Sequence, residues 1–366
     1  MGNEYANSEM RLHRRLAPFS FLYGIGVGLR NMLFDWNVLP SEHFPIPVIC
    51  IGNLSVGGTG KTPHTEYLIR LLKTKYRVAV LSRGYKRRSS GFVLATATTS
   101  ARDLGDEPYQ MKHKFPDVQV AVDTDRRRGI RNLLRLPEEV RPEIILLDDA
   151  FQHRYVSPSF SIVLTDVHRL FYEDRLLPVG LLREPVRGVE RADVVIVTKC
   201  EAGMKPIDFR VIENNMNLQP WQQLFFTRIV YDEIVPVFPE EARPLRREEI
   251  REDEDVLAIA GIASPEPFVR EVKRYSKRVV PMLFPDHHAF NKADFRKLEA
   301  VFGEMRSSGK LIIVTEKDAA RLRETAALPS EWRSVLYYLP ITVEFYNGSA
   351  FDEKVEKHLM EFYKKG

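Results

Sequence analysis

The sequence predicts an α/β fold with a large, mostly parallel sheet flanked by helices, followed by a smaller α/β unit. Apolar strand-like runs alternate with helical runs between residues 47 and 200, which is typical of parallel sheets covered on both faces. A glycine-rich loop follows the first of these strands, and a second alternating set begins at residue 256. The length of 366 residues favours about two domains.

The N-terminal region contains an uncharged run, residues 16–29, with arginines on both sides. The run is shorter than the ~20 apolar residues that span a bilayer, and no small-residue cleavage site follows it. Basic flanks around an apolar, aromatic-rich helix favour an amphipathic helix lying in a membrane interface. An ordinary core helix explains the same pattern, and these residues alone do not decide. We assign residues 1–36 to this region.

The first strand and the loop after it form the strongest motif. Residues 48–51 are apolar, and the chain then runs through a glycine-rich loop to Gly60, Lys61 and Thr62 before a helix. In a P-loop, backbone N–H groups surround the phosphates, the lysine reaches the terminal ones and the hydroxyl holds Mg²⁺. Ser55 stands where the strict pattern has glycine. The expected phosphate-binding residues are Ser55, Val56, Gly57, Gly58, Thr59, Gly60, Lys61 and Thr62. The larger unit is therefore predicted to be P-loop NTPase-like.

Two acidic pairs accompany this loop. Asp148 and Asp149 end an apolar strand, the position of an acid that holds Mg²⁺ in P-loop enzymes. Asp106 and Glu107 lie in a turn that, taken alone, favours a solvated surface. If this turn faces the phosphates, Asp106 can accept the proton of an attacking hydroxyl and Glu107 can reach Mg²⁺. The expected metal-site residues are Thr62, Glu107, Asp148 and Asp149.

Basic residues that could neutralise phosphate charge also follow strands and turns. Arg126 lies in an arginine run, and Arg183 lies beside Pro185 in a turn. The net charge of +4 is too small to indicate nucleic-acid binding. Two cysteines imply neither a disulfide framework nor a zinc site, and they suit a reducing compartment. Nothing in the sequence implies a protein partner.

The second unit follows a connector rich in proline and charge. We assign residues 37–235 to the P-loop domain, 236–255 to the linker and 256–366 to the smaller domain. Strands are expected at 256–260, 279–283 and 311–315, with helices near 291–302 and 349–365. His287 lies in a loop between a strand and a helix, and adjacent histidines alone do not make a closed metal site.

Two segments keep other functions open. Residues 315–318 and the pair Thr198 and Lys199 resemble the Asn-Lys-x-Asp element that reads guanine in GTPases. A P-loop GTPase acting as a regulator or metallochaperone is therefore the alternative hypothesis. A non-catalytic nucleotide-binding scaffold is the third.

Taken together, several segments resemble the tetraacyldisaccharide 4′-kinase family of lipid A biosynthesis. The resemblance rests on residues 52–62, 82–85, 105–108, 148–153, 182–185, 286–287 and 315–318. Their order and spacing match along nearly the whole chain. Ala150 departs from the glycine usual in this family, whereas Ser55 is compatible with the family's P-loop.

The resemblance implies ATP- and Mg²⁺-dependent phosphorylation of the 4′-hydroxyl of a tetraacyldisaccharide 1-phosphate, giving lipid IVA. It implies that Asp106 is the catalytic base with His287 as its partner, and that Lys61, Arg126 and Arg183 act near the phosphates. It also implies peripheral attachment to an anionic membrane surface, on the cytoplasmic face of the inner membrane. With a lipid substrate, the N-terminal helix is expected to be the docking element.

Overall fold

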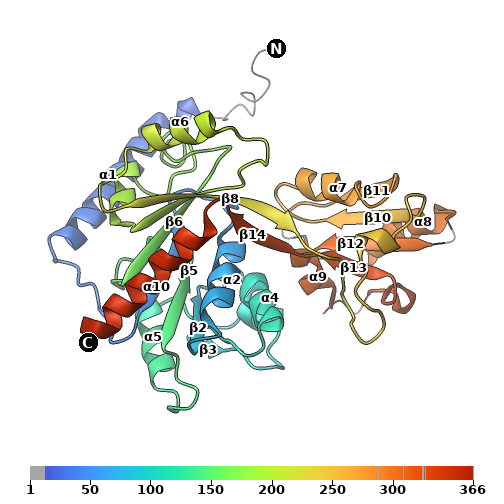
Figure 1. Cartoon of the computed structure of the whole chain (residues 1–366), viewed down its shortest axis with the longest axis horizontal. Helices are drawn as coiled ribbons and strands as arrows, with labels where there is room; N and C mark the ends of the chain where they lie inside the picture. Colours follow the sequence, from blue (N-terminus) through green and yellow to red (C-terminus); the bar gives the residue numbers. More distant parts are fainter. Residues whose placement is uncertain (1–12, 287, 308, 324, 326, 366) are drawn as a thin grey trace.

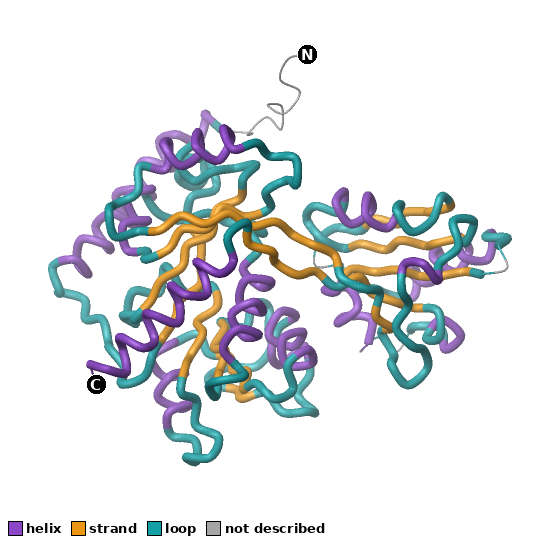
Figure 2. The backbone as a smooth tube through the Cα atoms, in the orientation of Figure 1, coloured by secondary structure: helices purple, strands orange, loops and turns teal. Residues whose placement is uncertain are grey.

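The computed structural model describes residues 13–286, 288–307, 309–323, 325 and 327–365. Two sheets organise these residues, a large one and a small one placed side by side (Figure 1). Helices and loops surround both sheets (Figure 2). The α/β class with a mostly parallel sheet, expected from the sequence, is confirmed.

The large sheet places the glycine-rich loop at its centre. Among the described residues it has nine strands, in the order β14-β8-β7-β6-β1-β5-β2-β4-β3. Neighbours are parallel except at the two ends, where β14 pairs with β8 and β3 with β4 in antiparallel fashion. In that order the bounds are Ile341–Phe345, Gln223–Tyr231, Val194–Thr198, Phe160–Asp166, Val48–Asn53, Ile144–Asp148, Val78–Ser82, Gln119–Val122 and Val93–Leu94.

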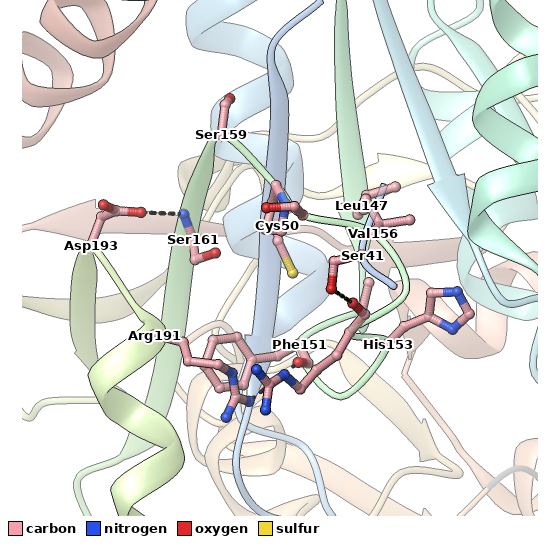
Figure 3. Close-up of a pocket in the computed structure, with 14 residues that line it drawn as sticks. Ser41, Cys50, Leu147, Phe151, His153, Val156, Ser159, Ser161, Arg191 and Asp193 are labelled. Atoms are coloured by element: carbon pink, nitrogen blue, oxygen red, sulfur yellow. Dashed lines mark hydrogen bonds between the residues drawn. The ribbon is translucent and has the colours of Figure 1, made fainter. Parts of the chain in front are cut away.

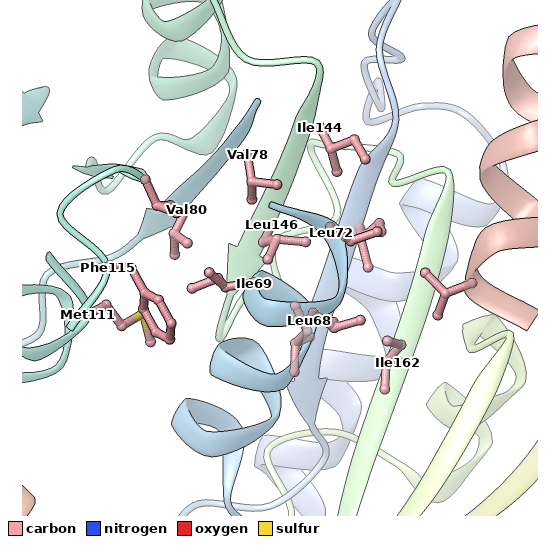
Figure 4. Packing of buried hydrophobic residues seen from close by; sticks show 14 of the residues in the cluster. Leu68, Ile69, Leu72, Val78, Val80, Met111, Phe115, Ile144, Leu146 and Ile162 are labelled. Atoms are coloured by element: carbon pink, nitrogen blue, oxygen red, sulfur yellow. The ribbon is translucent and has the colours of Figure 1, made fainter. Parts of the chain in front are cut away.

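The central strands β1 and β5 are buried at every position because helices cover both faces of the sheet. On one face, Leu68, Ile69 and Leu72 of α2 pack against strand residues such as Leu146 (Figure 4). α4 and α10 join this cluster, while α5 and α6 pack on the other face. The bounds are Lys61–Leu72 (α2), Asp106–Lys114 (α4), Arg126–Leu134 (α5), Pro206–Met216 (α6) and Gly348–Lys365 (α10), with the short α3 at Ala101–Leu104.

The small sheet has the order β11-β10-β12-β13-β9 and its own core. Its strands span Arg278–Leu283, Asp255–Ala260, Lys310–Thr315, Leu336–Leu339 and Val235–Pro236. Helices α7 (Glu266–Val272), α8 (Lys292–Glu304) and α9 (Glu316–Arg323) cover it. Asn291 caps α8 by accepting from the N–H groups of Ala293 and Asp294, as its sequence position predicts. Single turns of 3₁₀ helix lie at Arg14–Leu16, Arg247–Glu249 and Ser330–Trp332, and a longer one at Val186–Arg191.

The chain passes between the sheets twice. β8 leads to β9, and β13 leads back to β14, so the last strand and α10 belong to the large sheet (Figure 1). The N–H of Asp232 donates to the Pro340 carbonyl at 3.0 Å, joining the two passages. The smaller unit was expected to span residues 256–366, but the small sheet ends at β13, and β14 pairs in the large sheet. We propose that residues 341–365 belong with the P-loop unit.

Helix α1 (Ala17–Asp35) lies against the large unit with an unusual orientation of its polar groups. The side chains on its inner face donate hydrogen bonds to loops of the large unit; they are Ser20, Tyr23, Arg30 and Asn31. Its outer face exposes Phe19, Phe21, Leu22, Ile25 and Leu29. Among the helices described, none is both long and apolar enough to cross a bilayer.

Candidate active site

The loop between β1 and α2 has the backbone geometry of a phosphate cradle. Gly57 and Gly60 take positive φ angles of 116° and 88°, which a side chain would strain. Gly60 is the N-cap of α2, so Lys61 and Thr62 open that helix and its free N–H groups face the loop. Gly57 and Gly58 are exposed, whereas Thr59 and Thr62 are buried. The open loop at a helix N-terminus can hold an anion.

Neighbouring strands hold this loop in place. Asn53 Nδ2 donates to Thr59 Oγ1 at 2.9 Å, and Thr198 Oγ1 donates to the Thr59 carbonyl at 2.9 Å. His64 Nδ1 lies 2.7 Å from the Gly60 carbonyl oxygen and Nε2 lies 3.0 Å from Thr227 Oγ1. Burial lowers the pKa of His64 to about 4, so this histidine is neutral at physiological pH. These bonds fix the loop before any ligand arrives.

Asp148 ends β5, directly beside the P-loop strand, and Asp149 follows it. Burial, together with the nearby carboxylates of Glu107 and Asp149, raises the pKa of Asp148 to about 7. Ser82 Oγ donates to Asp148 Oδ2 at 3.1 Å, while Oδ1 is buried and has no hydrogen-bond partner among the described residues. The site thus concentrates negative charge around an oxygen that can take a cation.

Asp149 is held by two cations. Lys61 Nζ lies 3.6 Å and Arg183 Nη1 lies 3.1 Å from its Oδ1. Burial acts to raise the pKa of Asp149, but these charges hold it below its usual range. Lys61 also contacts Asn53 Oδ1 at 3.4 Å. The structure therefore brings Lys61, Arg183 and Asp149 together at the carboxyl edge of the sheet.

Arg126 takes a different position. Its guanidinium is buried and donates to the carbonyls of Asp123 and Thr124, with longer contacts of 3.5 and 3.4 Å to those of Asp148 and Asp149. Burial lowers the pKa of this guanidinium, against the attraction of the two carboxylates. In this structure the Arg126 side chain contacts the backbone at the end of β5, and no contact of it with the side chain of Lys61 or Arg183 is described.

The acidic turn faces the phosphate loop. Gly105 has φ 89°, and a Cβ there would lie 2.8 Å from the Tyr85 carbonyl oxygen, so only glycine fits before α4. Asp106 and Glu107 form the first helical turn, where the helix dipole favours acids. Burial acts to raise the pKa of Glu107, yet Lys317 and Lys61 give a net downward shift. The solvated-surface interpretation of this turn is therefore wrong.

Helix α9 of the small unit binds the same turn. Lys317 Nζ lies 2.7 Å from Glu107 Oε1, and Arg321 Nη2 lies 2.9 Å from Asp106 Oδ2. Lys114 of α4 bridges Glu66 of α2 and Glu316 of α9 at 2.6 and 2.7 Å. Sequence reasoning missed Lys317 and Arg321, whose only signal was their place in or just after residues 315–318.

Two other expected elements are used differently. Asp318, the acid of the Asn-Lys-x-Asp-like segment, is fully buried and accepts from the Gly261 N–H at 2.8 Å and from Thr315 Oγ1 at 2.6 Å. Lys199 pairs with Asp166 at 2.6 Å. Asp318 therefore serves the small unit and not a base pocket. His287, expected beside Asp106, lies outside the described residues.

A metal site was expected at Thr62, Glu107, Asp148 and Asp149. Within the described part of the chain no group of three or more histidine, cysteine, aspartate or glutamate side chains is arranged as a metal cage. The donor set nevertheless suits Mg²⁺, which is commonly held by one or two carboxylates together with substrate phosphates. The unpartnered Oδ1 of Asp148 fits this requirement.

A separate cavity of about 320 Å³ lies beside Cys50 and Phe151 (Figure 3). No P-loop residue lines it, and it reaches Asp193 at the amino end of β7. The two arginines that line it are already paired, Arg191 with Glu184 at 2.8 Å and Arg154 with Asp35 at 2.7 Å. Because both arginines are already in ion pairs, neither offers this cavity an uncompensated positive charge for an anion.

Comparisons with known proteins give one consistent set of relatives. The family model described as tetraacyldisaccharide-1-P 4′-kinase matches residues 12–360. The chain is 57% identical over 352 residues to the tetraacyldisaccharide 4′-kinase of Parabacteroides distasonis, covering 96% of this chain and 95% of that protein. The enzyme of that name from Bacteroides thetaiotaomicron is 49% identical, covering 97% and 94%.

A solved structure also matches over most of the chain. It is LpxK from Aquifex aeolicus, described as a complex with ATP. The TM-score is 0.73 at 29% identity, and the match covers 94% of this chain and 99% of that one.

Proposed function

The chain belongs to the tetraacyldisaccharide 4′-kinase family, and from that premise we propose how its residues act. The chain is an ATP-dependent kinase that transfers the γ-phosphate of ATP to the 4′-hydroxyl of a tetraacyldisaccharide 1-phosphate. The observation that supports the assignment of the site is the place of Asp106 and Glu107 at the start of α4, where the charges of Lys61 and Asp149 act on Glu107. In this turn, Asp106 would accept the proton of the attacking hydroxyl, and Glu107 would lie close to the cation at the phosphates.

We assign the following roles to residues of the large unit. The loop from Ser55 to Thr62 holds the phosphates through N–H groups, and Lys61 neutralises the γ-phosphate. Arg183, whose guanidinium lies 3.1 Å from Asp149 Oδ1, turns from that carboxylate towards the transferred group. Arg126 adds positive potential from behind β5. Charge placed where negative charge develops is the largest contribution expected in phosphoryl transfer.

Asp106 accepts the proton of the 4′-hydroxyl as the oxygen attacks phosphorus. A sugar hydroxyl is a weak nucleophile at neutral pH, and a positioned base contributes roughly 10²–10⁴ in rate. We propose His287 as the partner that holds this proton with Asp106. Both hydrogen bonds from Arg321 end on Asp106 Oδ2, so approach of the hydroxyl to that oxygen would require α9 to shift relative to α4.

Mg²⁺ bound by Thr62 and Asp148, with Glu107 and Asp149 close by, would neutralise the phosphate oxygens. This assignment rests on the orphaned Oδ1 of Asp148 and on the raised pKa of its carboxyl. The Asp148 carboxyl, whose pKa burial raises to about 7, would release its proton as the cation binds.

The lipid substrate calls for a surface that meets a membrane, and α1 offers one. The outer face of this helix exposes large apolar side chains such as Phe21, which is 70% exposed, and Trp36 at the C-cap is 65% exposed. Its polar groups point inwards, the reverse of a helix that faces water. We therefore propose that α1 lies in the interface of an anionic bilayer, assisted by exposed Arg15. Because ATP is supplied in the cytoplasm, we assign the enzyme to the cytoplasmic face of the inner membrane.

The test is nucleotide consumption by the purified protein in mixed micelles. We expect ATP turnover to require the acylated disaccharide 1-phosphate and Mg²⁺, with a product heavier by one phosphate. GTP hydrolysis without any lipid would instead support the regulator hypothesis. Binding of ATP with no turnover under any of these conditions would support the scaffold.

A further inference from the structure

The inner face of α1 is bonded to the two loops behind the phosphate site. Tyr23 Oη donates to the Arg183 carbonyl at 2.7 Å, and Arg30 Nη2 donates to the Gln152 carbonyl at 2.9 Å. Asn31 Nδ2 contacts Glu184 Oε2 at 3.4 Å. The helix therefore contacts the backbone of Arg183 and Gln152. The Arg183 side chain in turn donates to the carboxylate of Asp149 and to the side-chain oxygen of Gln152.

These loops are continuous with the P-loop. The Arg183 N–H donates to the Leu54 carbonyl at 2.7 Å, and the Val56 N–H donates to the Leu181 carbonyl at 2.8 Å. Residues 181–183 thus pair with the first half of the phosphate loop. Gln152 Nε2 donates to the Asn53 carbonyl at 2.7 Å, which ties the second loop to the end of β1. A shift of α1 would act on both sides of the nucleotide site.

Resting on the membrane docking proposed above, we propose that Tyr23 and Arg30 are positioning residues that couple bilayer binding to nucleotide binding. A bilayer restrains the outer face of α1, and the restrained helix then holds the Arg183 and Gln152 backbones where the phosphates need them. Coupling between two binding sites is reciprocal. Vesicles therefore raise the affinity for ATP, and ATP raises the affinity for vesicles by the same factor.

The variants follow from the geometry. Tyr23→Phe removes one hydroxyl from the inner face and leaves the exposed apolar face intact. Tyr363 of α10 offers a matched control. Its hydroxyl also donates to a backbone carbonyl, that of Glu143, at 3.0 Å. Arg30→Met tests the second bond independently and keeps an apolar stem of similar length.

The measurement is the dissociation constant of a non-hydrolysable ATP analogue with Mg²⁺, with and without phosphatidylglycerol-containing vesicles, on the full chain. We expect vesicles to tighten binding about fivefold, the contribution of roughly one hydrogen bond. Tyr23→Phe and Arg30→Met should each bring this ratio towards one. Vesicle affinity without nucleotide should stay unchanged in Tyr23→Phe, whereas Arg30→Met also loses one positive charge and should bind anionic vesicles less tightly by itself. Tyr363→Phe should keep the wild-type ratio.

Two outcomes would overturn the coupling alone: vesicles bind wild type without changing its nucleotide affinity, or both inner-face variants keep the wild-type ratio. Wild type that does not bind vesicles would overturn both the coupling and the docking proposal. The last outcome is distinguished by the vesicle-binding measurement itself, made before nucleotide is added.

Discussion

Arg321 of α9 donates two hydrogen bonds to Asp106 Oδ2, at 3.0 Å from Nε and 2.9 Å from Nη2, across 215 residues of sequence. The same guanidinium binds the fully buried Asp318 at 2.9 Å. One arginine of the small unit thus holds both a structural carboxylate and the candidate base of the large unit. Access to that base depends on how the two units meet.

Removing this guanidinium should destabilise the protein. In Arg321→Met the carboxylate of Asp318 stays buried and loses its charged partner, which typically costs about 3–5 kcal/mol. Thermal or urea unfolding measures the loss. Arg333→Met, which breaks an exposed ion pair with Glu241, should cost no more than ~1 kcal/mol. Equal effects of the two substitutions would contradict the structural role of Arg321.

The base itself is tested by Asp106→Asn. The amide keeps an oxygen for Arg321 but cannot accept the hydroxyl proton, so kcat should fall by roughly 10²–10⁴ while ATP affinity is retained. Steady-state kinetics and nucleotide titration measure the two quantities. The control is Asp103→Asn, an exposed acid on α3 that should have near-normal activity. An unchanged kcat in Asp106→Asn would remove this residue as the base.

The buried carboxylate of Glu66 should make stability depend on pH. Burial, with repulsion from Glu316, raises its pKa from 4.5 to about 6 although Lys114 opposes the shift. Between these values the folded protein holds a proton that the unfolded chain has released, so this group's contribution to stability falls as pH rises through that window.

Glu66→Gln lacks this titration and keeps an acceptor for Gln110 Nε2, which lies 3.1 Å from Glu66 Oε1. The free energy of unfolding of the variant minus that of wild type should therefore rise by about 2 kcal/mol between pH 4.5 and pH 7. Urea unfolding at several pH values measures the difference. A difference that stays constant with pH would contradict the raised pKa.

The outer face of α1 should decide attachment to membranes. Replacing Phe21, Leu22 and Ile25 with serine removes three exposed apolar side chains and should weaken vesicle binding at least about tenfold. Flotation with anionic vesicles measures the effect. Met360→Ser changes an exposed apolar residue of α10 and should have no effect. Undiminished flotation of the triple variant would show that another surface binds the bilayer.

The sequence alone was sufficient to predict features that depend on a few neighbouring residues. The glycine-rich loop and the strand ending in Asp148 are recognisable because a strand, a turn and a helix start each depend on a few neighbouring residues. Residues 341–365 were expected in the smaller unit and the strand β14 was not predicted, because sequence patterns do not show which strands pair with one another. β14 returns to β8 after the small sheet is complete.

Contacts between the units were also beyond the sequence. Lys317 and Arg321 look like ordinary charges on an exposed helix face, and only the fold shows that they meet Glu107 and Asp106. In the same way, residues 105–108 alone do not reveal that α4 begins there. The ambiguity of residues 16–29 remained because burial of an apolar helix depends on which of its faces the rest of the fold covers.

The measurement that tests the central claim most directly is the position of the new phosphate. Tetraacyldisaccharide 1-phosphate is incubated with the protein, ATP and Mg²⁺, and the product is examined by ³¹P–¹H correlation spectroscopy. We predict one added phosphate ester, coupled to the proton at the 4′ carbon, and no such product with Asp106→Asn in the same time. A phosphate on any other hydroxyl, or ATP hydrolysis that leaves the disaccharide unchanged, would contradict the account.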